Sequence, residues 1–304
     1  MTRVPIAIGA VAVAAAAALC AGLITTPRPA FTTVTAELDA PGDAERGRLI
    51  FAAGDCSSCH ASPGQSDPLK LGGSMALASP FGTMRVPNIS PHPQDGIGTW
   101  STRDLANALL SGVSPRAEHY FPAFPYPSYV KMRVADVADL MAYLRTLPPV
   151  AGKAPPHELS FPFNIRRFVG FWKVLFLDTD PIVEDPAKSA AWNRGRYLVE
   201  AVAHCAECHS SRNLLGGIRE DTRFAGGPDP EGTGFIPNIT PARLGSWTEA
   251  DIAELLLSGR TPSGDTVGSS MKSVVSNTAK LPPSDRAAIA TYIKSLPFRP
   301  TPSP

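Results

Sequence analysis

CSSCH at residues 56–60 and CAECH at residues 205–209 are two copies of one pattern, Cys-x-x-Cys-His. The gap of two residues places both sulfurs of a copy on one helical turn, and the histidine follows directly. This is the attachment signature of c-type haem, in which two thiols add to the porphyrin and the imidazole binds its iron. We therefore predict two haem groups, one in each half of the chain. The predicted attachment and iron-binding residues are Cys56, Cys59, His60, Cys205, Cys208 and His209.

The cysteine count agrees with this prediction. Four of the five cysteines belong to the two motifs, and the fifth, Cys20, lies in an apolar stretch near the N-terminus. A zinc site with four thiolate ligands is the main alternative for two Cys-x-x-Cys pairs. Neither zinc nor a disulfide explains the histidine that follows each pair.

The composition favours short helices joined by long loops. The 304 residues include 32 prolines and 25 glycines, and few runs resemble strands. The length suggests about two domains. The formal net charge is +1 and there is no basic cluster, so we expect no nucleic-acid partner.

An uncharged apolar stretch begins at Val4, behind Arg3, and ends at Ile24. Its length is that of a membrane-spanning helix, and Arg3 favours an N-terminus in the cytoplasm. We predict that this stretch anchors the chain, with the body on the periplasmic side of the bacterial inner membrane. The alternative is a cleaved signal peptide with its site at Ala16-x-Ala18, which would leave a soluble periplasmic protein.

The chain repeats itself around the two haem motifs. Five segments, the motifs included, recur in one order, so chance similarity of loops is a poor explanation. The other four pairs are RGRL at 46–49 and RGRYL at 194–198, PNIS at 87–90 and PNIT at 237–240, GTWS at 98–101 and GSWT at 245–248, and YLRTLP at 143–148 and YIKSLP at 292–297. Ser101 and Thr248 predict the starts of two middle helices, and Gly112 and Gly259 predict their ends.

Each half is thus expected to contain a helix leading into the haem motif, a long loop, a middle helix, a ligand loop and a terminal helix. That order is the plan of a class I cytochrome c. The predicted fold is all-α, with two tandem cytochrome c domains at residues 42–150 and 188–304 and a connector at 151–187. Residues 1–41 would form the membrane or signal helix and a linker.

A methionine in the loop before the terminal helix usually supplies the sixth iron ligand, and thioether ligation favours reduced iron. Met271 lies in that loop in the second half, and we predict that it binds iron. In the first half the equivalent count falls on Phe124, which cannot bind iron. We therefore predict Met132, the next candidate in the loop. His119 is a rival, and an open iron position is the remaining alternative.

The connector interleaves aromatic and basic residues over 161–177. Such a segment can lie as an amphipathic helix on a membrane surface or on a partner protein. We favour the other interpretation, in which it packs between the haem domains and fixes their orientation.

With these motifs, and with HYFPAFPY at 119–126 and VGSSM at 267–271, the chain resembles the membrane-anchored multihaem cytochrome c subunits of periplasmic dehydrogenases. Such subunits serve alcohol, aldehyde, gluconate and fructose dehydrogenases. The resemblance covers nearly the whole chain and implies the same haem-binding roles for the two motifs and for Met271. This chain departs from the family in two respects. It has two haem motifs where many such subunits have three, and it has Phe124 where some have methionine.

The resemblance implies a dihaem electron-transfer subunit and no catalytic side chains. A periplasmic dehydrogenase would be the electron donor, and a quinone, a cytochrome or an oxidase of the respiratory chain would be the acceptor. Such a protein holds its cofactors and sets their potentials, without making or breaking bonds itself. The alternative is a dihaem enzyme, a peroxidase or thiosulfate dehydrogenase, that uses an open or displaceable position on the first haem.

Overall fold

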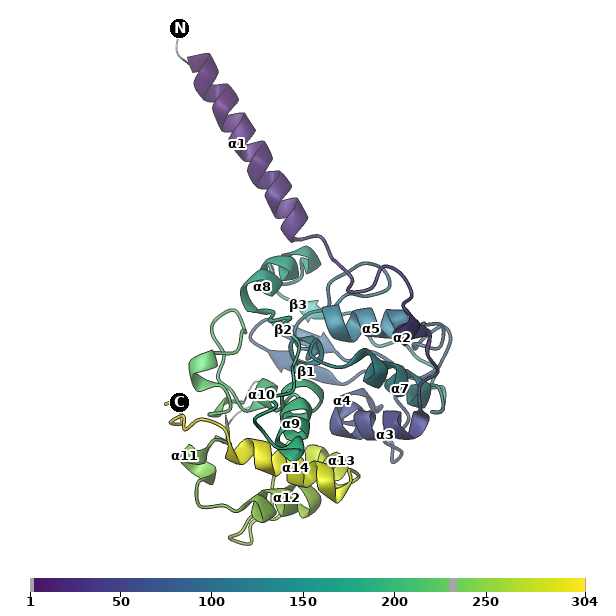
Figure 1. Cartoon of the computed structure of the whole chain (residues 1–304). Helices are drawn as coiled ribbons and strands as arrows, with labels where there is room; N and C mark the ends of the chain where they lie inside the picture. The colour runs from purple at the N-terminus through teal and green to yellow at the C-terminus, as the bar shows by residue number, and fades with distance from the viewer. Residues whose placement is uncertain (1–2, 230–233, 304) are drawn as a thin grey trace.

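The structure is a computed structural model that describes residues 3–229 and 234–303; in the first helix, side chains are described from residue 12 onward. The chain is mostly helical, as predicted (Figure 1). The helices of the first half are α2 (Ala36–Asp39), α3 (Ala44–Ala53), α4 (Cys56–His60), α5 (Thr102–Ser111), α6 (Tyr126–Tyr129) and α7 (Val134–Leu144). Those of the second half are α9 (Ala190–Tyr197), its π-helical extension η2 (Leu198–Val202), α10 (Cys205–Cys208), η3 (Glu220–Thr222), α11 (Pro241–Leu244), α12 (Glu249–Ser258), α13 (Met271–Thr278) and α14 (Pro283–Lys294).

In each half the first long helix crosses the terminal helix at a glycine. A Cβ atom on Gly47 of α3 would lie 1.9 Å from the carbonyl oxygen of Asp139 in α7. A Cβ atom on Gly195 of α9 would lie 1.9 Å from the carbonyl oxygen of Ala288 in α14. Only glycine lets the two backbones approach this closely. This contact explains the glycine in both RGR segments.

The first arginine of each RGR segment ties the same pair of helices together. The Nε atom of Arg46 donates to Asp139 Oδ2 at 2.7 Å, and Arg194 Nη2 donates to Asp285 Oδ2 at 2.8 Å. Because Asp139 is almost fully buried, its carboxylate depends on this partner and on the backbone N–H of Asp43, 2.6 Å away.

The middle helices begin and end where the sequence predicts. Ser101 caps α5 and Thr248 caps α12, and each forms a reciprocal capping box with the aspartate three residues on. The helices end at Gly112 and Gly259, whose φ angles of 58° and 75° are left-handed.

The expectation of an all-α fold with long loops is incomplete, because the structure contains short strands. Strands β1 (Ala76–Ser79), β2 (Gly82–Arg85) and β3 (Glu158–Leu159) form an antiparallel sheet in that order. A second pair joins β4 (Gly227–Pro228) to β5 (Phe235–Ile236). Runs of two to four residues are too short for an alternating pattern to reveal them. Strand β3 comes from the connector, which is thereby attached to the first half.

The rest of the connector forms η1 (Arg166–Phe168) and α8 (Val169–Phe176), which contact both halves. Lys173 Nζ donates to the carbonyl oxygens of Ser111 and Gly112, at 2.6 and 2.9 Å. On the other side, Trp172 Nε1 donates to the carbonyl oxygen of Leu215 at 2.9 Å. Helix α8 thus contacts both halves, as the preferred interpretation expects, and the further expectation that the connector fixes the orientation of two haem domains stays a prediction.

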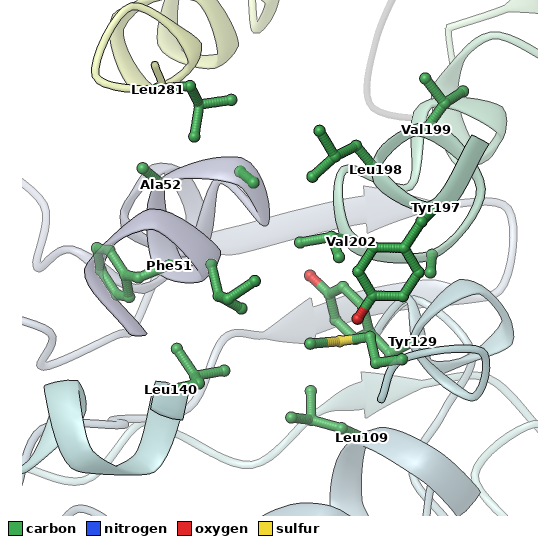
Figure 2. Packing of buried hydrophobic residues seen from close by; sticks show 14 of the residues in the cluster. Phe51, Ala52, Leu109, Tyr129, Leu140, Tyr197, Leu198, Val199, Val202 and Leu281 are labelled. Atoms are coloured by element: carbon green, nitrogen blue, oxygen red, sulfur yellow. The ribbon is translucent and has the colours of Figure 1, made fainter. Parts of the chain in front are cut away.

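The two halves share one core. A single cluster of buried apolar side chains includes Phe51, Leu109 and Leu140 from the first half and Leu198 and Val202 from the second (Figure 2). The halves therefore pack as one body, although the domain boundaries given above stay a prediction.

Helix α1 (Arg3–Ile24) projects from the body beside α8 (Figure 1). Within the part of the chain that the structure describes, no helix is both long and apolar enough to cross a membrane. The side chains of residues 4–11, the first part of the predicted anchor, lie outside that part. The prediction of a membrane-spanning helix is thus not supported by the structure.

Candidate haem-binding sites

Each motif forms a short helical turn that begins behind a left-handed residue. Asp55, before the first cysteine of α4, has a φ of 51°, and His204, at the same place before α10, has a φ of 41°. In this conformation the chain turns sharply from the preceding helix into the motif. The two turns thereby present their cysteines and histidine in the same way.

The motif histidines are fixed by the carbonyl groups of the PNI segments. His60 Nδ1–H donates to the carbonyl oxygen of Pro87 at 2.9 Å, and His209 Nδ1–H donates to that of Pro237 at 2.7 Å. A carbonyl oxygen can only accept, so the proton is on Nδ1 and Nε2 keeps a lone pair. This is the arrangement found for metal-binding histidines, in which the second ring nitrogen sets the orientation.

The asparagines of the PNI segments hold those loops in place. Asn88 Nδ2 donates to the carbonyl oxygen of Val150 at 2.7 Å, and Asn238 Nδ2 donates to that of Arg299 at 2.8 Å. Both asparagines are buried. They link each PNI loop to the chain that leaves the terminal helix, so the carbonyl group facing each histidine is rigidly placed.

Burial sets the protonation of the motif side chains. It lowers the pKa of His60 to about 4 and lowers the pKa of His209 as well. It raises the pKa of the Cys56 and Cys205 thiols to about 12. The imidazoles are therefore neutral near pH 7, as iron ligation requires. The thiols are protonated in this state and none of them is in a disulfide.

The arrangement of the motifs does not favour the zinc alternative. Across residues 3–229 and 234–303, no group of three or more His, Cys, Asp or Glu side chains is placed to hold a metal ion between them. The two motifs are separate sites, each with two cysteines and one oriented imidazole. These residues fit covalently attached haem, whose iron takes one imidazole from each motif.

The predicted sixth ligands differ in their surroundings. Met271 is half-buried, packs against the shared core and is the first residue of α13, between α12 and α14. The sequence predicted a loop at this place, and the role of Met271 as an iron ligand stays a prediction. Met132 is 7% exposed and lies two residues before α7. Leu281, which cannot bind iron, is 3% exposed and lies two residues before α14. The match with Leu281 shows that this position can be filled without an iron ligand, and the role of Met132 as a ligand stays a prediction.

The other candidates of the first half are also held by protein contacts. The ring of Phe124 packs at 5.5 to 6.2 Å, between centroids, from the rings of Tyr120, Tyr126 and Tyr129. His119 is buried, and its Nε2–H donates to the carbonyl oxygen of Thr25 at 3.2 Å. This bond ties His119 to the residue that follows α1.

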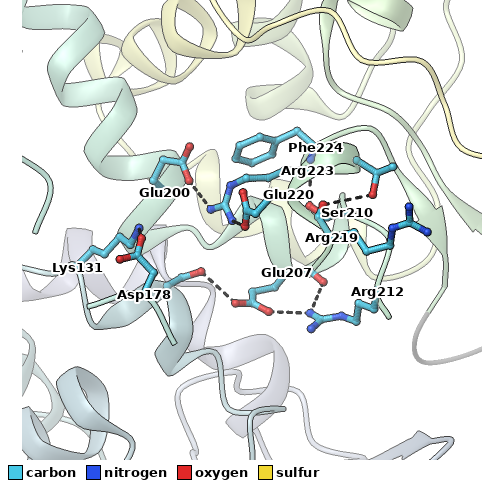
Figure 3. Close-up of polar contacts among 12 residues, drawn as sticks. Lys131, Asp178, Glu200, Glu207, Ser210, Arg212, Arg219, Glu220, Arg223 and Phe224 are labelled. Atoms are coloured by element: carbon cyan, nitrogen blue, oxygen red, sulfur yellow. Dashed lines mark hydrogen bonds and ion pairs between the residues drawn. The ribbon is translucent and has the colours of Figure 1, made fainter. Parts of the chain in front are cut away.

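The structure brings each motif into contact with the opposite half, which the sequence did not predict. One of the two residues between the cysteines of each copy makes this contact. Ser57 accepts from Asn277 Nδ2 at 3.2 Å, and Glu207 accepts from Ser128 Oγ at 3.1 Å. Glu207 is also paired with Arg212 at 2.7 Å (Figure 3).

The residues in front of the motifs meet as well. His204 Nε2–H donates to the carbonyl oxygen of Gly54 at 3.3 Å, and Tyr129 Oη donates to the same oxygen at 3.4 Å. The rings of Tyr129 and His204 lie 5.5 Å apart between centroids. Asp55 accepts a further hydrogen bond from Asn277. The two attachment motifs are therefore connected through direct contacts between the halves.

A mostly helical fold with two such sites defines a c-type cytochrome. The profile of the cytochrome c family matches residues 44–148. A protein described as a diheme cytochrome c-type from Cereibacter sphaeroides is 52% identical over 259 residues, which are 84% of this chain and 86% of that protein. The chain belongs to the dihaem c-type cytochromes, which carry covalently attached haem c and transfer electrons.

Two further relatives are parts of dehydrogenases by name. One of the subunits of nicotinate dehydrogenase from Pseudomonas putida is 39% identical over 83% of this chain, and the fructose dehydrogenase cytochrome subunit of Gluconobacter japonicus is 35% identical over 84%. The matched regions are 21% and 52% of those two proteins. The chain thus spans about half or less of the length of these relatives.

Proposed function

We propose that this chain accepts electrons from a dehydrogenase in the periplasm and passes them to a quinone, a cytochrome or an oxidase of the respiratory chain. The observation that carries the proposal is the pair of oriented motifs in a chain that matches a dihaem cytochrome over most of both lengths. The names of the relatives support a dehydrogenase as donor. The dihaem enzyme alternative is not favoured by them.

The proposed roles follow the geometry of the sites. Four cysteines would hold the two haem groups, and His60, His209, Met271 and Met132 would bind iron. The attaching cysteines are Cys56, Cys59, Cys205 and Cys208. When bound, haem iron supplies one-electron chemistry. The chain orients the imidazoles through Pro87 and Pro237 and keeps them neutral by burial.

The proposed location is the periplasmic side of the inner membrane. A dehydrogenase partner and covalent haem attachment both agree with export. The proposal of membrane attachment rests on the uncharged apolar sequence of residues 4–24, which belongs to the projecting helix α1 (Figure 1). Carbonate extraction of membranes should retain the full chain if α1 is an anchor and release it if residues 1–24 are removed on export.

The function is tested with purified protein made in cells that attach haem c. Its mass should exceed that of the polypeptide by two haem groups. Nicotinate, fructose and alcohol dehydrogenases, each with its substrate, should be compared for their ability to reduce it, followed by the sharp absorption band of reduced haem. Reduction by at least one of them at stoichiometric concentration is the expected result.

The control is the same mixture without the dehydrogenase substrate. A protein with one high-spin haem that binds carbon monoxide and turns over peroxide or thiosulfate without a partner would contradict the proposal and favour the enzyme.

A further inference from the structure

The outward face of α8 carries an apolar stripe that is left exposed by the part of the chain that the structure describes. Phe168, Phe171, Val174 and Leu175 follow helical spacing and are 47%, 39%, 68% and 63% exposed. Large apolar side chains on a solvent-facing stripe of this kind indicate an interaction surface. The opposite face of α8 is the one that packs on the body through Lys173.

The stripe continues onto a neighbouring loop of the second half. Leu214 and Leu215 are 97% and 50% exposed, in a tight turn between Asn213 and Gly216. This turn is fixed against α8, because Trp172 Nε1 donates to the carbonyl oxygen of Leu215. The two residues that this bond joins are about 40 positions apart in the sequence. Two separate segments therefore expose apolar side chains next to each other.

The stripe also continues onto the end of α1. A Cβ atom on Gly170 would lie 2.6 Å from the Cα atom of Thr25, so α8 and the end of α1 are in backbone contact. Val174 lines one cavity of about 710 Å³ together with Leu23 and Ile24 of α1. Leu23 and Ile24 are themselves 52% and 41% exposed. Figure 1 shows α8 at the end of the body from which α1 departs.

Positive charges border part of this apolar surface. Residues 161–177 contain Arg166 and Arg167 and no acidic residue, while Lys173 of the same segment faces the body. Arg28 and Arg167 are exposed beside the end of α1. Aromatic and aliphatic side chains surrounded by arginine are the composition of a segment that lies in the headgroup region of a bilayer.

We infer that α8, the turn at 213–216 and the end of α1 together rest on an anionic lipid surface, with the apolar stripe in the headgroup region. This inference deepens the membrane-side location given under the proposed function and rests on it. It does not require α1 to cross the bilayer. It adds a second membrane contact that would set the tilt of the two haem domains relative to the lipid.

The test uses the full-length, haem-loaded protein and vesicles of phosphatidylcholine with or without phosphatidylglycerol. Hydrogen–deuterium exchange of peptides covering 165–177 and 211–217 should slow in the anionic vesicles. Val174→Glu combined with Leu175→Glu should lower partitioning onto the vesicles by about tenfold or more, because two aliphatic side chains leave the lipid. The matched control is Val183→Glu combined with Phe298→Glu, two residues as exposed but outside the stripe.

Two outcomes would overturn the inference. In one, vesicles leave the exchange at 165–177 and 211–217 unchanged while the protein still floats with them through α1. In the other, the vesicle-free protein forms a dimer that the double glutamate variant breaks, which would assign the stripe to a second copy of the chain. Neither outcome bears on the proposed electron transfer, because reduction of both haems by a dehydrogenase is measured without vesicles.

Discussion

Met271 and Met132 lie in corresponding segments of the two halves. The repeat places Phe124 at the position of Met271 and Leu281 at the position of Met132. We expect Met271→Leu to turn the second haem from low-spin to high-spin and to lower its potential by roughly 0.1 V or more, because leucine provides no axial ligand. Optical spectra and a redox titration measure both effects. Met141→Leu is the control, since Met141 is buried inside α7.

Met132→Leu decides the first sixth ligand. The change copies Leu281, which occupies the equivalent place before α14. A high-spin first haem in this variant would establish Met132 as the ligand. An unchanged spectrum, with unfolding within about 1.5 kcal/mol of the parent, would show that Met132 only packs, as expected for a swap that conserves volume.

His119 gives the fold a pH dependence in the acidic range. Burial lowers its pKa from 6.5 to about 4 in the folded chain. Between these values the unfolded chain binds a proton that the folded chain does not, so the free energy of unfolding falls as the pH drops from about 6.5 to about 4. We expect His119→Gln to flatten this dependence in urea unfolding at pH 7, 6 and 5. The same slope in the variant as in the parent would contradict the prediction, and His92→Gln, at a partly exposed position, is the control.

At the scale of elements, Gly47 and Gly195 fix how closely the first long helix of each half packs against the terminal helix. Gly47→Ala should cost about 3 kcal/mol or more, because the new methyl group meets the backbone of Asp139 and neither helix can shift without breaking the pairing of Arg46. Chemical denaturation measures the cost. Gly22→Ala, where an added Cβ meets nothing within 4 Å, should change stability by less than about 0.5 kcal/mol.

Elements with local signals were predictable from the sequence. The caps at Ser101 and Thr248, the helix ends at Gly112 and Gly259, and the motif histidines depend on residues a few positions apart. The strands were missed because each has at most four residues. The partners of the motifs were missed because Ser57 and Asn277 are 220 residues apart, and no local pattern in either segment points to the other.

The sequence predicts the chemistry of the site, but it does not decide which residue is the second iron ligand. The Cys-x-x-Cys-His spacing specifies attachment and one axial ligand in a single turn. The second iron ligand is predicted to come from the segment before the terminal helix, where the two halves carry different residues. Phe124, Met132 and His119 all lie in that segment of the first half, and spacing alone does not choose among them. His119 is held by Thr25, 94 residues away, which no local pattern reveals.

At the scale of the whole molecule, Asn277 connects the halves. It donates to Asp55 and Ser57 of the first half while Lys280 donates to its side-chain oxygen. Asn277→Ala leaves a buried hydroxyl and carboxyl group with fewer partners, so we expect a loss of about 1 to 3 kcal/mol. Calorimetry should then show two transitions in place of one. A single unshifted transition would contradict this, and Asn164→Ala at an exposed position is the control.

The contacts of Ser57 and Glu207 with opposite halves bear on how the protein is made. The segment between the two cysteines of each copy is covered once the halves close. Cysteines beside a covered segment are harder to reach than cysteines on an open chain. We therefore expect haem attachment at both copies to be more efficient before the halves close than after.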